Sequence, residues 1–180
     1  RIHATRIRTA STPPTPMTTI GPTCGSLREF LDVFDLLYPL LRDGNAVERI
    51  AYELVEDCAT ENIRHVEVRL APELQRTDAF STDAVVESVL KGLKRGYRDF
   101  GTTSSVIVCL FRSHGPKENS RAFETLRRFF RPEAALGDIS VVGVDLAGDE
   151  ARHPTIQYAD YYEQAKRLGI FTTCHAGETE

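Results

Sequence analysis

Two short polar segments of this sequence follow apolar runs and carry residue types that hydrolytic chemistry uses. Residues Asp145 to Glu150 read Asp-Leu-Ala-Gly-Asp-Glu, and residues His175 to Glu178 read His-Ala-Gly-Glu. A neutral imidazole such as His175 can bind a metal ion, and a carboxyl group three residues later can move protons beside it. Histidine and glutamate beside a metal-polarised water form a recurrent hydrolytic pair. The two segments therefore predict a site for metal-assisted hydrolysis.

Taken singly, most of these residues have a simpler interpretation. One histidine at a strand end more often fills a structural role, since a catalytic zinc usually has three protein ligands. Gly148 could bring its backbone N–H against a ligand because it lacks a Cβ, but alone it is most simply a turn glycine. Asp149 and Glu150 are most simply a solvated loop rim. A thiol nucleophile is disfavoured because Cys174 and His175, as adjacent strand residues, point to opposite faces.

One further charged pair lies on a predicted strand. Glu67 and Arg69 are two residues apart, so they share one face of that strand. They could pair with charged groups inside the fold or serve a functional site. Pairing inside the fold is the favoured interpretation.

The elements that must position these segments alternate along the chain. Helical periodicity covers residues 27–41, 45–62, 82–100 and 119–131, and a last helix begins at Pro154 and ends at Gly169. Strands are expected over residues 65–70, 105–111, 139–145 and 170–174. Such alternation predicts a parallel sheet with right-handed crossovers. Because the carboxyl ends of parallel strands meet at one edge, the two polar segments are expected to be neighbours there.

The composition is that of a soluble globular protein, with 41% apolar and 27% charged residues. The net charge of -4 gives no reason to expect a nucleic-acid partner or an anionic membrane surface. No apolar run approaches the roughly 20 residues that span a bilayer. The cysteines are widely spaced and form no Cys-x-x-Cys motif, which favours buried reduced thiols and a cytoplasmic location. They are Cys24, Cys58, Cys109 and Cys174.

Residues 1–24 differ from the rest of the chain. They are rich in threonine, serine and proline, and the first acidic residue of the chain is Glu29. Basic, hydroxyl-rich and acid-poor sequence is typical of a transit peptide. However, the chain begins with Arg1 and its only methionine is Met17, so a disordered or non-native segment is the favoured interpretation. Residues 25–180 are expected to form the folded part.

The run Val144 to Glu150, followed by His175 to Glu178, closely resembles the adenosine deaminase family. Two motifs at the proper spacing are far more specific than either alone. Three other segments fit the family in the same order, and the resemblance covers about residues 25–180. These segments are Ile50 to Glu53, Val66 to Pro72 (similar to the family's second barrel strand) and Gly96 to Gly101.

The resemblance implies a partial (β/α)8 TIM barrel. A closed barrel of this kind typically needs about 250 residues, and the chain has 180. We therefore expect strands two to five with their helices, without the first strand and the C-terminal strands. The implied reaction is zinc-dependent hydrolysis of adenosine and 2'-deoxyadenosine to inosine and ammonia, in purine metabolism.

The same resemblance assigns roles to three residues. His175 is expected to be a Zn²⁺ ligand, and Glu178 to carry a proton to the purine ring nitrogen. Gly148 is expected to hold the purine nucleoside through its backbone N–H. Zinc would activate the attacking water at neutral pH. The expected ligand is a small purine nucleoside, and the sequence leaves protein partners open.

The sequence departs from the family pattern in its metal ligands. The family's first strand supplies two zinc ligands from a His-x-His pair, whereas here His3 is followed two residues later by Thr5. With His175 as the one ligand retained, we expect the 180-residue chain alone neither to hold zinc tightly nor to deaminate adenosine. Two alternatives stay open. One is a deaminase of N6-substituted purine nucleotides in the same superfamily, and the other is a non-catalytic fragment that acts as a binding module.

Overall fold

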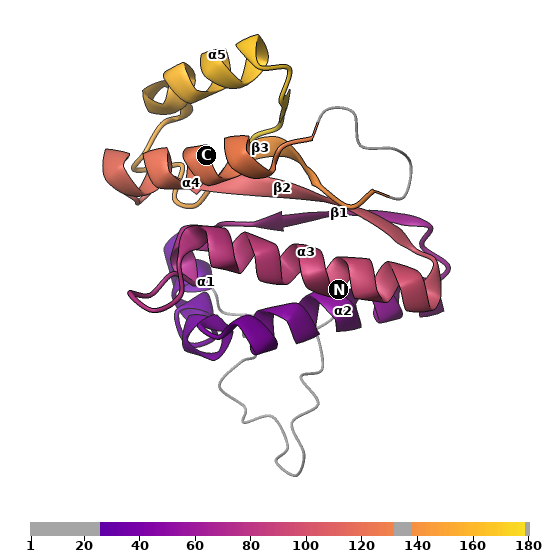
Figure 1. Cartoon of the computed structure of the whole chain (residues 1–180). Helices are drawn as coiled ribbons and strands as arrows, with labels where there is room; N and C mark the ends of the chain where they lie inside the picture. Colours follow the sequence, from indigo (N-terminus) through magenta and orange to yellow (C-terminus); the bar gives the residue numbers. More distant parts are fainter. Residues whose placement is uncertain (1–25, 132–137, 179–180) are drawn as a thin grey trace.

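Four parallel strands form the single sheet of this chain in a computed structural model that describes residues 26–131 and 138–178 (Figure 1). The order in the sheet is β1-β2-β3-β4, the same as the order in the chain. Each connection therefore moves one strand along the sheet, as in a (β/α)8 barrel. The expected partial barrel is confirmed, while the interpretation of residues 1–24 lies outside the described residues. The strands are β1 (His65–Leu70), β2 (Thr103–Phe111), β3 (Val141–Ala147) and β4 (Phe171–Thr172).

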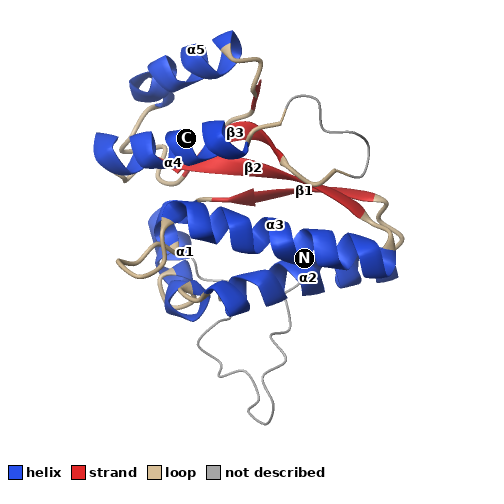
Figure 2. Cartoon of the chain, viewed as in Figure 1, coloured by secondary structure: helices blue, strands red, loops and turns tan. Residues whose placement is uncertain are grey.

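Helices connect these strands and cover the sheet (Figure 2). α3 joins β1 to β2, α4 joins β2 to β3, and α5 joins β3 to β4, while α2 packs along α3. The α-helices are α1 (Leu27–Phe34), α2 (Gly44–Thr60), α3 (Thr82–Phe100), α4 (Pro116–Phe129) and α5 (Ala159–Arg167), and the short 3-10 helices are η2 (Tyr38–Leu41), η3 (Pro72–Leu74) and η4 (Thr155–Tyr158). No helix within the described ranges is long and apolar enough to cross a membrane.

Two of the expected helices are divided in the structure. The helix expected over residues 27–41 ends at Phe34, and Pro39 lies in η2, because proline supplies no N–H to continue an α-helix. The helix expected from Pro154 begins with η4, and regular α-helix starts at Ala159. By contrast, the helix expected over residues 82–100 has the predicted bounds.

The last strand is shorter than predicted. Only Phe171 and Thr172 form β4, in register with Gly143 and Val144 of β3. The backbone beyond it nevertheless keeps bonding to β3, since the N–H of His175 donates to the carbonyl of Leu146 at 3.0 Å. The residue expected to bind metal is thus anchored to the neighbouring strand.

The two faces of the sheet differ in polarity. Alternate residues of β2 and β3 enter one apolar core with the helices, among them Val106, Val108, Leu110, Val144 and Leu146. Residues of the opposite parity lie on the other face, where Arg69 and Cys109 both contact Asp145. In a closed barrel this second face is the interior. The functional residues are therefore sought at its carboxyl end.

The contact between α2 and α3 depends on glycine. A Cβ at Gly92 would lie 2.2 Å from the carbonyl oxygen of Glu48 and 2.8 Å from the Cβ of Ala51. Alanine is normally favoured over glycine in a helix. Here we expect Gly92→Ala to reduce the free energy of unfolding by roughly 1–3 kcal/mol, because the helices must separate. Urea unfolding followed by circular dichroism measures this change.

A control for Gly92→Ala is available on the solvent face of the same helix. Lys94 is exposed, so Lys94→Ala should change the free energy of unfolding by less than about 0.5 kcal/mol. Equal stability of the Gly92→Ala and Lys94→Ala chains would show that the two helices can adjust without cost.

Candidate active site

The two polar segments meet at the carboxyl edge of the sheet, as predicted. Gly148 follows β3, and His175 and Glu178 follow β4. The bond from the His175 N–H to the Leu146 carbonyl places the second segment beside the end of β3. The N–H of Arg112 donates to the Ala147 carbonyl at 2.8 Å, which brings the end of β2 to the same place.

A buried carboxylate, Asp145, lies at the centre of this region. Its residue is 0% exposed, and its Oδ2 lies 2.8 Å from Nδ1 of His175 and 3.2 Å from Nε of Arg69. Oδ1 accepts the N–H of Leu146 at 2.8 Å. Both interpretations left open for Arg69 apply, because it pairs with a buried charge and that charge is the carboxylate that contacts His175. Arg69 thus belongs to both the fold and the candidate site.

Cys109 completes the surroundings of this carboxylate. Its Sγ lies 3.8 Å from Oδ2 of Asp145. Burial, and then the negative charge of Asp145, raise the pKa of the Cys109 thiol. In this position Cys109 can act as a weak S–H donor to Asp145.

The contact with Asp145 defines what His175 can do. A carboxylate oxygen only accepts hydrogen bonds, so a neutral imidazole that bonds to it donates from Nδ1 and keeps a lone pair on Nε2. Metal-ligating histidines commonly donate their other ring N–H to a carboxylate in this way. The side chain of His175 is 36% exposed, so the ring is accessible. His175 therefore fits the role of a metal ligand.

The rest of a metal site is not formed by the described residues. Within residues 26–131 and 138–178, no three His, Cys, Asp or Glu side chains gather closely enough to hold a metal ion. A catalytic zinc usually has three protein ligands. This part of the chain thus offers one oriented imidazole and no complete metal site.

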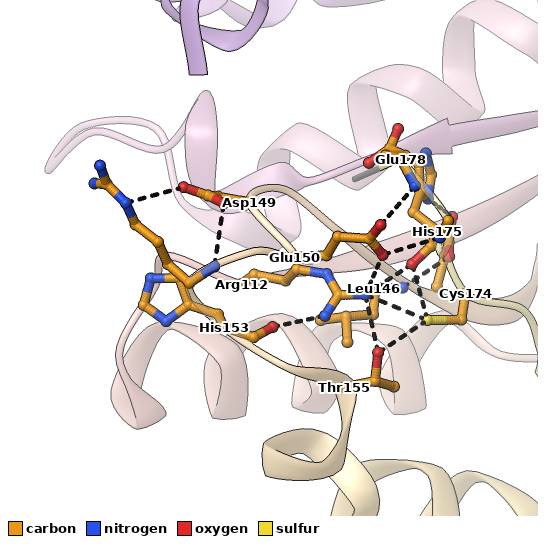
Figure 3. A network of polar contacts seen from close by, with 12 residues as sticks. Arg112, Leu146, Asp149, Glu150, His153, Thr155, Cys174, His175 and Glu178 are labelled. Atoms are coloured by element: carbon orange, nitrogen blue, oxygen red, sulfur yellow. Dashed lines mark hydrogen bonds and ion pairs between the residues drawn. The ribbon is translucent and has the colours of Figure 1, made fainter. Parts of the chain in front are cut away.

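Arg112 is the main residue of the site that sequence reasoning missed. Its guanidinium is fully buried, and it donates to three oxygen atoms that follow β3 and β4 and, more weakly, to Sγ of Cys174 at 3.7 Å (Figure 3). The acceptors are the carbonyl oxygens of His153 and His175, each at 2.7 Å, and the hydroxyl of Thr155 at 3.0 Å. Its sequence signal was an arginine directly after the apolar strand, at the edge where functional groups gather.

Glu150 fixes the turn that carries Glu178. Its carboxylate accepts the backbone N–H of Gly177 at 3.2 Å and that of Glu178 at 2.5 Å. The guanidinium of Arg112 lies 3.8 Å from the same carboxylate. The interpretation of Asp149 and Glu150 as a solvated rim was wrong, since Asp149 is 6% exposed and the Glu150 side chain 13%. Glu150 contacts the segment after β4, whereas Asp149 accepts the N–H of Arg152 at 3.3 Å within its own loop.

The backbone requires glycine at position 148. Its φ is +100°, a conformation that residues with a Cβ rarely adopt. A Cβ there would also lie 3.2 Å from the ring of Phe111. The simpler interpretation, a turn glycine, is therefore confirmed. The role of its N–H toward a purine stays a prediction.

An open cavity of about 940 Å³ lies elsewhere, between α5 and β4. Cys174 lines it, together with Ile156, Tyr162 and Phe171, whereas His175, Glu178 and Gly148 do not. Cys174 and His175 thus lie on different sides of the strand end, as expected of adjacent residues. The Sγ of Cys174 instead approaches the His175 carbonyl oxygen at 3.2 Å, so the pair does not form a thiol–imidazole nucleophile.

Parallel strands in chain order, with the polar residues at their carboxyl ends, define part of a (β/α)8-type barrel with its functional face. Within that class, the sequence profile of the adenosine deaminase family matches residues 12–180, and the chain belongs to this family. An adenosine deaminase of Clostridium perfringens is 32% identical over 156 residues, which cover 87% of this chain and 45% of that protein. The chain spans less than half the length of the curated relatives it matches.

Solved structures support the same fold. An amidohydrolase from Burkholderia ambifaria, determined with bound Zn, has a TM-score of 0.73 and 26% identity over 89% of this chain and 41% of that chain. The N6-methyl-AMP deaminase of Arabidopsis thaliana has a TM-score of 0.69 and 26% identity, covering 86% of this chain and 46% of that chain.

Proposed function

We propose that this chain serves the hydrolytic deamination of adenosine and 2'-deoxyadenosine to inosine and ammonia, with Zn²⁺ as the cofactor. The observation that carries the proposal is the pairing of His175 with buried Asp145, at 2.8 Å, on the same edge as Gly148 and Glu178. Curated adenosine deaminases are 32–33% identical to the chain, which supports adenosine as the substrate.

Each residue of the site has a proposed role in this reaction. His175 would hold the metal through Nε2, because Nδ1 is engaged by Asp145. When bound, zinc would supply the Lewis acid that activates water at neutral pH. Glu178 would give a proton to the purine ring nitrogen, which makes C6 more electrophilic. Gly148 would donate its backbone N–H to the purine, and Glu150 would keep the Glu178 backbone in place.

A second candidate function is deamination of N6-substituted purine nucleotides. The similarity to the Arabidopsis N6-methyl-AMP deaminase, at 26% identity, favours it. The higher identity to adenosine deaminases makes it the runner-up. Comparing turnover of adenosine with that of N6-methyl-AMP separates the two.

A cytoplasmic location is proposed with this function. The described cysteines Cys58, Cys109 and Cys174 are free thiols, which suits a reducing compartment. The proposed ligand is a small purine, and neither nucleic acid nor a membrane surface is needed by the mechanism. Alkylation of the three thiols in unreduced protein isolated from cells tests this proposal.

The reaction is tested by following the ultraviolet change from adenosine to inosine. We expect no turnover and only weak zinc binding from the 180-residue chain alone, because its described part supplies one metal ligand. Where the gene encodes a longer polypeptide, that polypeptide should turn over adenosine. A chelator should abolish that activity, and added Zn²⁺ should restore it.

Two results would contradict these expectations. Stoichiometric zinc and normal turnover in the 180-residue chain would show that it holds a complete site. Purine binding without turnover by the longer polypeptide, with zinc supplied, would instead favour the binding-module alternative. N6-methyl-AMP serves as the comparison substrate in both preparations.

A further inference from the structure

We propose that Asp145 is a positioning residue that keeps His175 in the tautomer with the proton on Nδ1, and that Arg69 holds Asp145 in the orientation this requires. The tautomer follows from the contacts of the chain itself. Its consequence for zinc affinity and turnover rests on the proposed function. Neither residue is expected to touch the substrate.

Hydrogen-bond donors surround the carboxylate of Asp145. Oδ1 accepts the N–H of Leu146, which the backbone fixes, and Oδ2 faces His175, Arg69 and Cys109. All four neighbours therefore present donors when the imidazole proton lies on Nδ1. With the proton on Nε2, the lone pair of Nδ1 would instead face Oδ2 of this buried carboxylate at 2.8 Å, and this contact between two acceptors disfavours that tautomer.

Arg69 reaches the carboxylate of Asp145 from a strand that is not adjacent to β3. Arg69 lies on β1 in register with Ile107, while Asp145 lies on β3 in register with Cys109. The guanidinium therefore crosses β2 diagonally to reach Asp145. Its side chain is 42% exposed, so it can swing away from Asp145.

An amide in place of the Asp145 carboxylate would reverse the hydrogen bond to His175. In Asp145→Asn, one oxygen becomes an NH2 group, which can only donate. The Leu146 N–H cannot move, so it keeps the amide oxygen at the Oδ1 position, and the NH2 group then faces His175. To accept this bond, the ring must move its proton to Nε2. A ring protonated at Nε2 cannot bind a metal through that nitrogen.

The test is the tautomer of His175 in the ¹⁵N-histidine-labelled 180-residue chain. Long-range proton–nitrogen correlation spectra distinguish the two neutral tautomers from each other and from the doubly protonated ring. The signal is assigned by its loss in His175→Gln. We expect the Nδ1–H form in the wild type and in Glu73→Gln, and the Nε2–H form in Asp145→Asn. Glu73 is a matched control because its side chain is 3% exposed and paired with Arg121.

Each outcome decides the proposal. The Nε2–H form in the wild type would overturn it, whether or not any variant folds. Retention of the Nδ1–H form in a folded Asp145→Asn chain would also overturn it. Arg69→Met should keep the Nδ1–H form as the main species with some Nε2–H form, since Asp145 loses its restraint. A spectrum identical to the wild type would remove Arg69 from the proposal.

The consequence for the metal is measured separately, in the longest polypeptide that the gene encodes. Removing the hydrogen-bond partner of a metal-binding side chain typically lowers metal affinity or activity by about 10- to 100-fold. We expect a loss of this size for Asp145→Asn. If the wild type neither binds zinc nor deaminates adenosine, the proposed function fails while the tautomer result still stands. If the wild type is active and Asp145→Asn keeps its zinc affinity, the positioning role fails alone.

Discussion

Replacing Glu178 by glutamine is expected to lower kcat for adenosine by about 10²- to 10⁴-fold, the usual contribution of a positioned proton donor. Glutamine has the same shape and can still form hydrogen bonds, but it cannot transfer a proton. The backbone of this residue is held by Glu150, and its side chain is exposed, so the substitution should leave the fold unchanged. The loss should therefore be one of chemistry alone.

The measurement is steady-state kinetics with the longest polypeptide that the gene encodes, together with its zinc content. Zinc content should stay at the wild-type value, because His175 and Asp145 are unaltered. Glu124→Gln is the matched control, since Glu124 is exposed on α4 and pairs with Arg127. Near wild-type turnover by Glu178→Gln would exclude this residue as the proton donor, whereas a large loss in both variants would indicate a nonspecific effect.

The parts of the fold that could be predicted are those with local chemical signals. The helix over residues 82–100 has its predicted bounds because Ser81 caps its first turn and Gly101 ends it with a φ of +79°. The helix predicted over residues 27–41 was wrong in its second half. Its apolar spacing continues past Phe34, but Pro39 has no backbone N–H to continue an α-helix beyond it, and Tyr38–Leu41 form a separate 3-10 helix.

The residues of the candidate site were likewise predictable only in part. His175 and Glu178 could be proposed from a short motif, and the structure shows them at the predicted edge. Asp145 was within the other motif, but nothing in the sequence indicated that its carboxylate faces His175. Such contacts depend on strand register, which sets Asp145 opposite Cys109. Glu67 was the nearer acidic neighbour of Arg69 in sequence, yet Asp145 on β3 is its partner.

Arg112 shows how a residue outside both motifs can determine their geometry. Its guanidinium N–H groups connect the loop after β3 with the segment after β4 by donating to the carbonyls of His153 and His175. Glu150 then extends the connection to the backbone of Glu178. The relative positions of the proposed metal ligand and proton donor thus depend on one buried cation.

Replacing Arg112 by methionine is accordingly expected to lower the free energy of unfolding by about 3–5 kcal/mol, the usual cost of removing one partner from a buried charged network. Methionine fills much of the volume but leaves two carbonyls and the Thr155 hydroxyl without their donor. Arg112→Lys should lose less, because it keeps the charge but not the planar fork. Urea unfolding of the 180-residue chain measures both changes.

Arg127→Met provides the comparison, because Arg127 is exposed on α4 and its loss should change stability by less than about 0.5 kcal/mol. Equal stability of the two methionine variants would mean that the buried guanidinium contributes nothing net to the fold. Kinetics of Arg112→Lys in the longer polypeptide add a second test. If the Arg112 guanidinium positions the turn that carries Glu178, kcat of Arg112→Lys should fall while the enzyme remains folded. Proton transfer depends more steeply on geometry than substrate binding does.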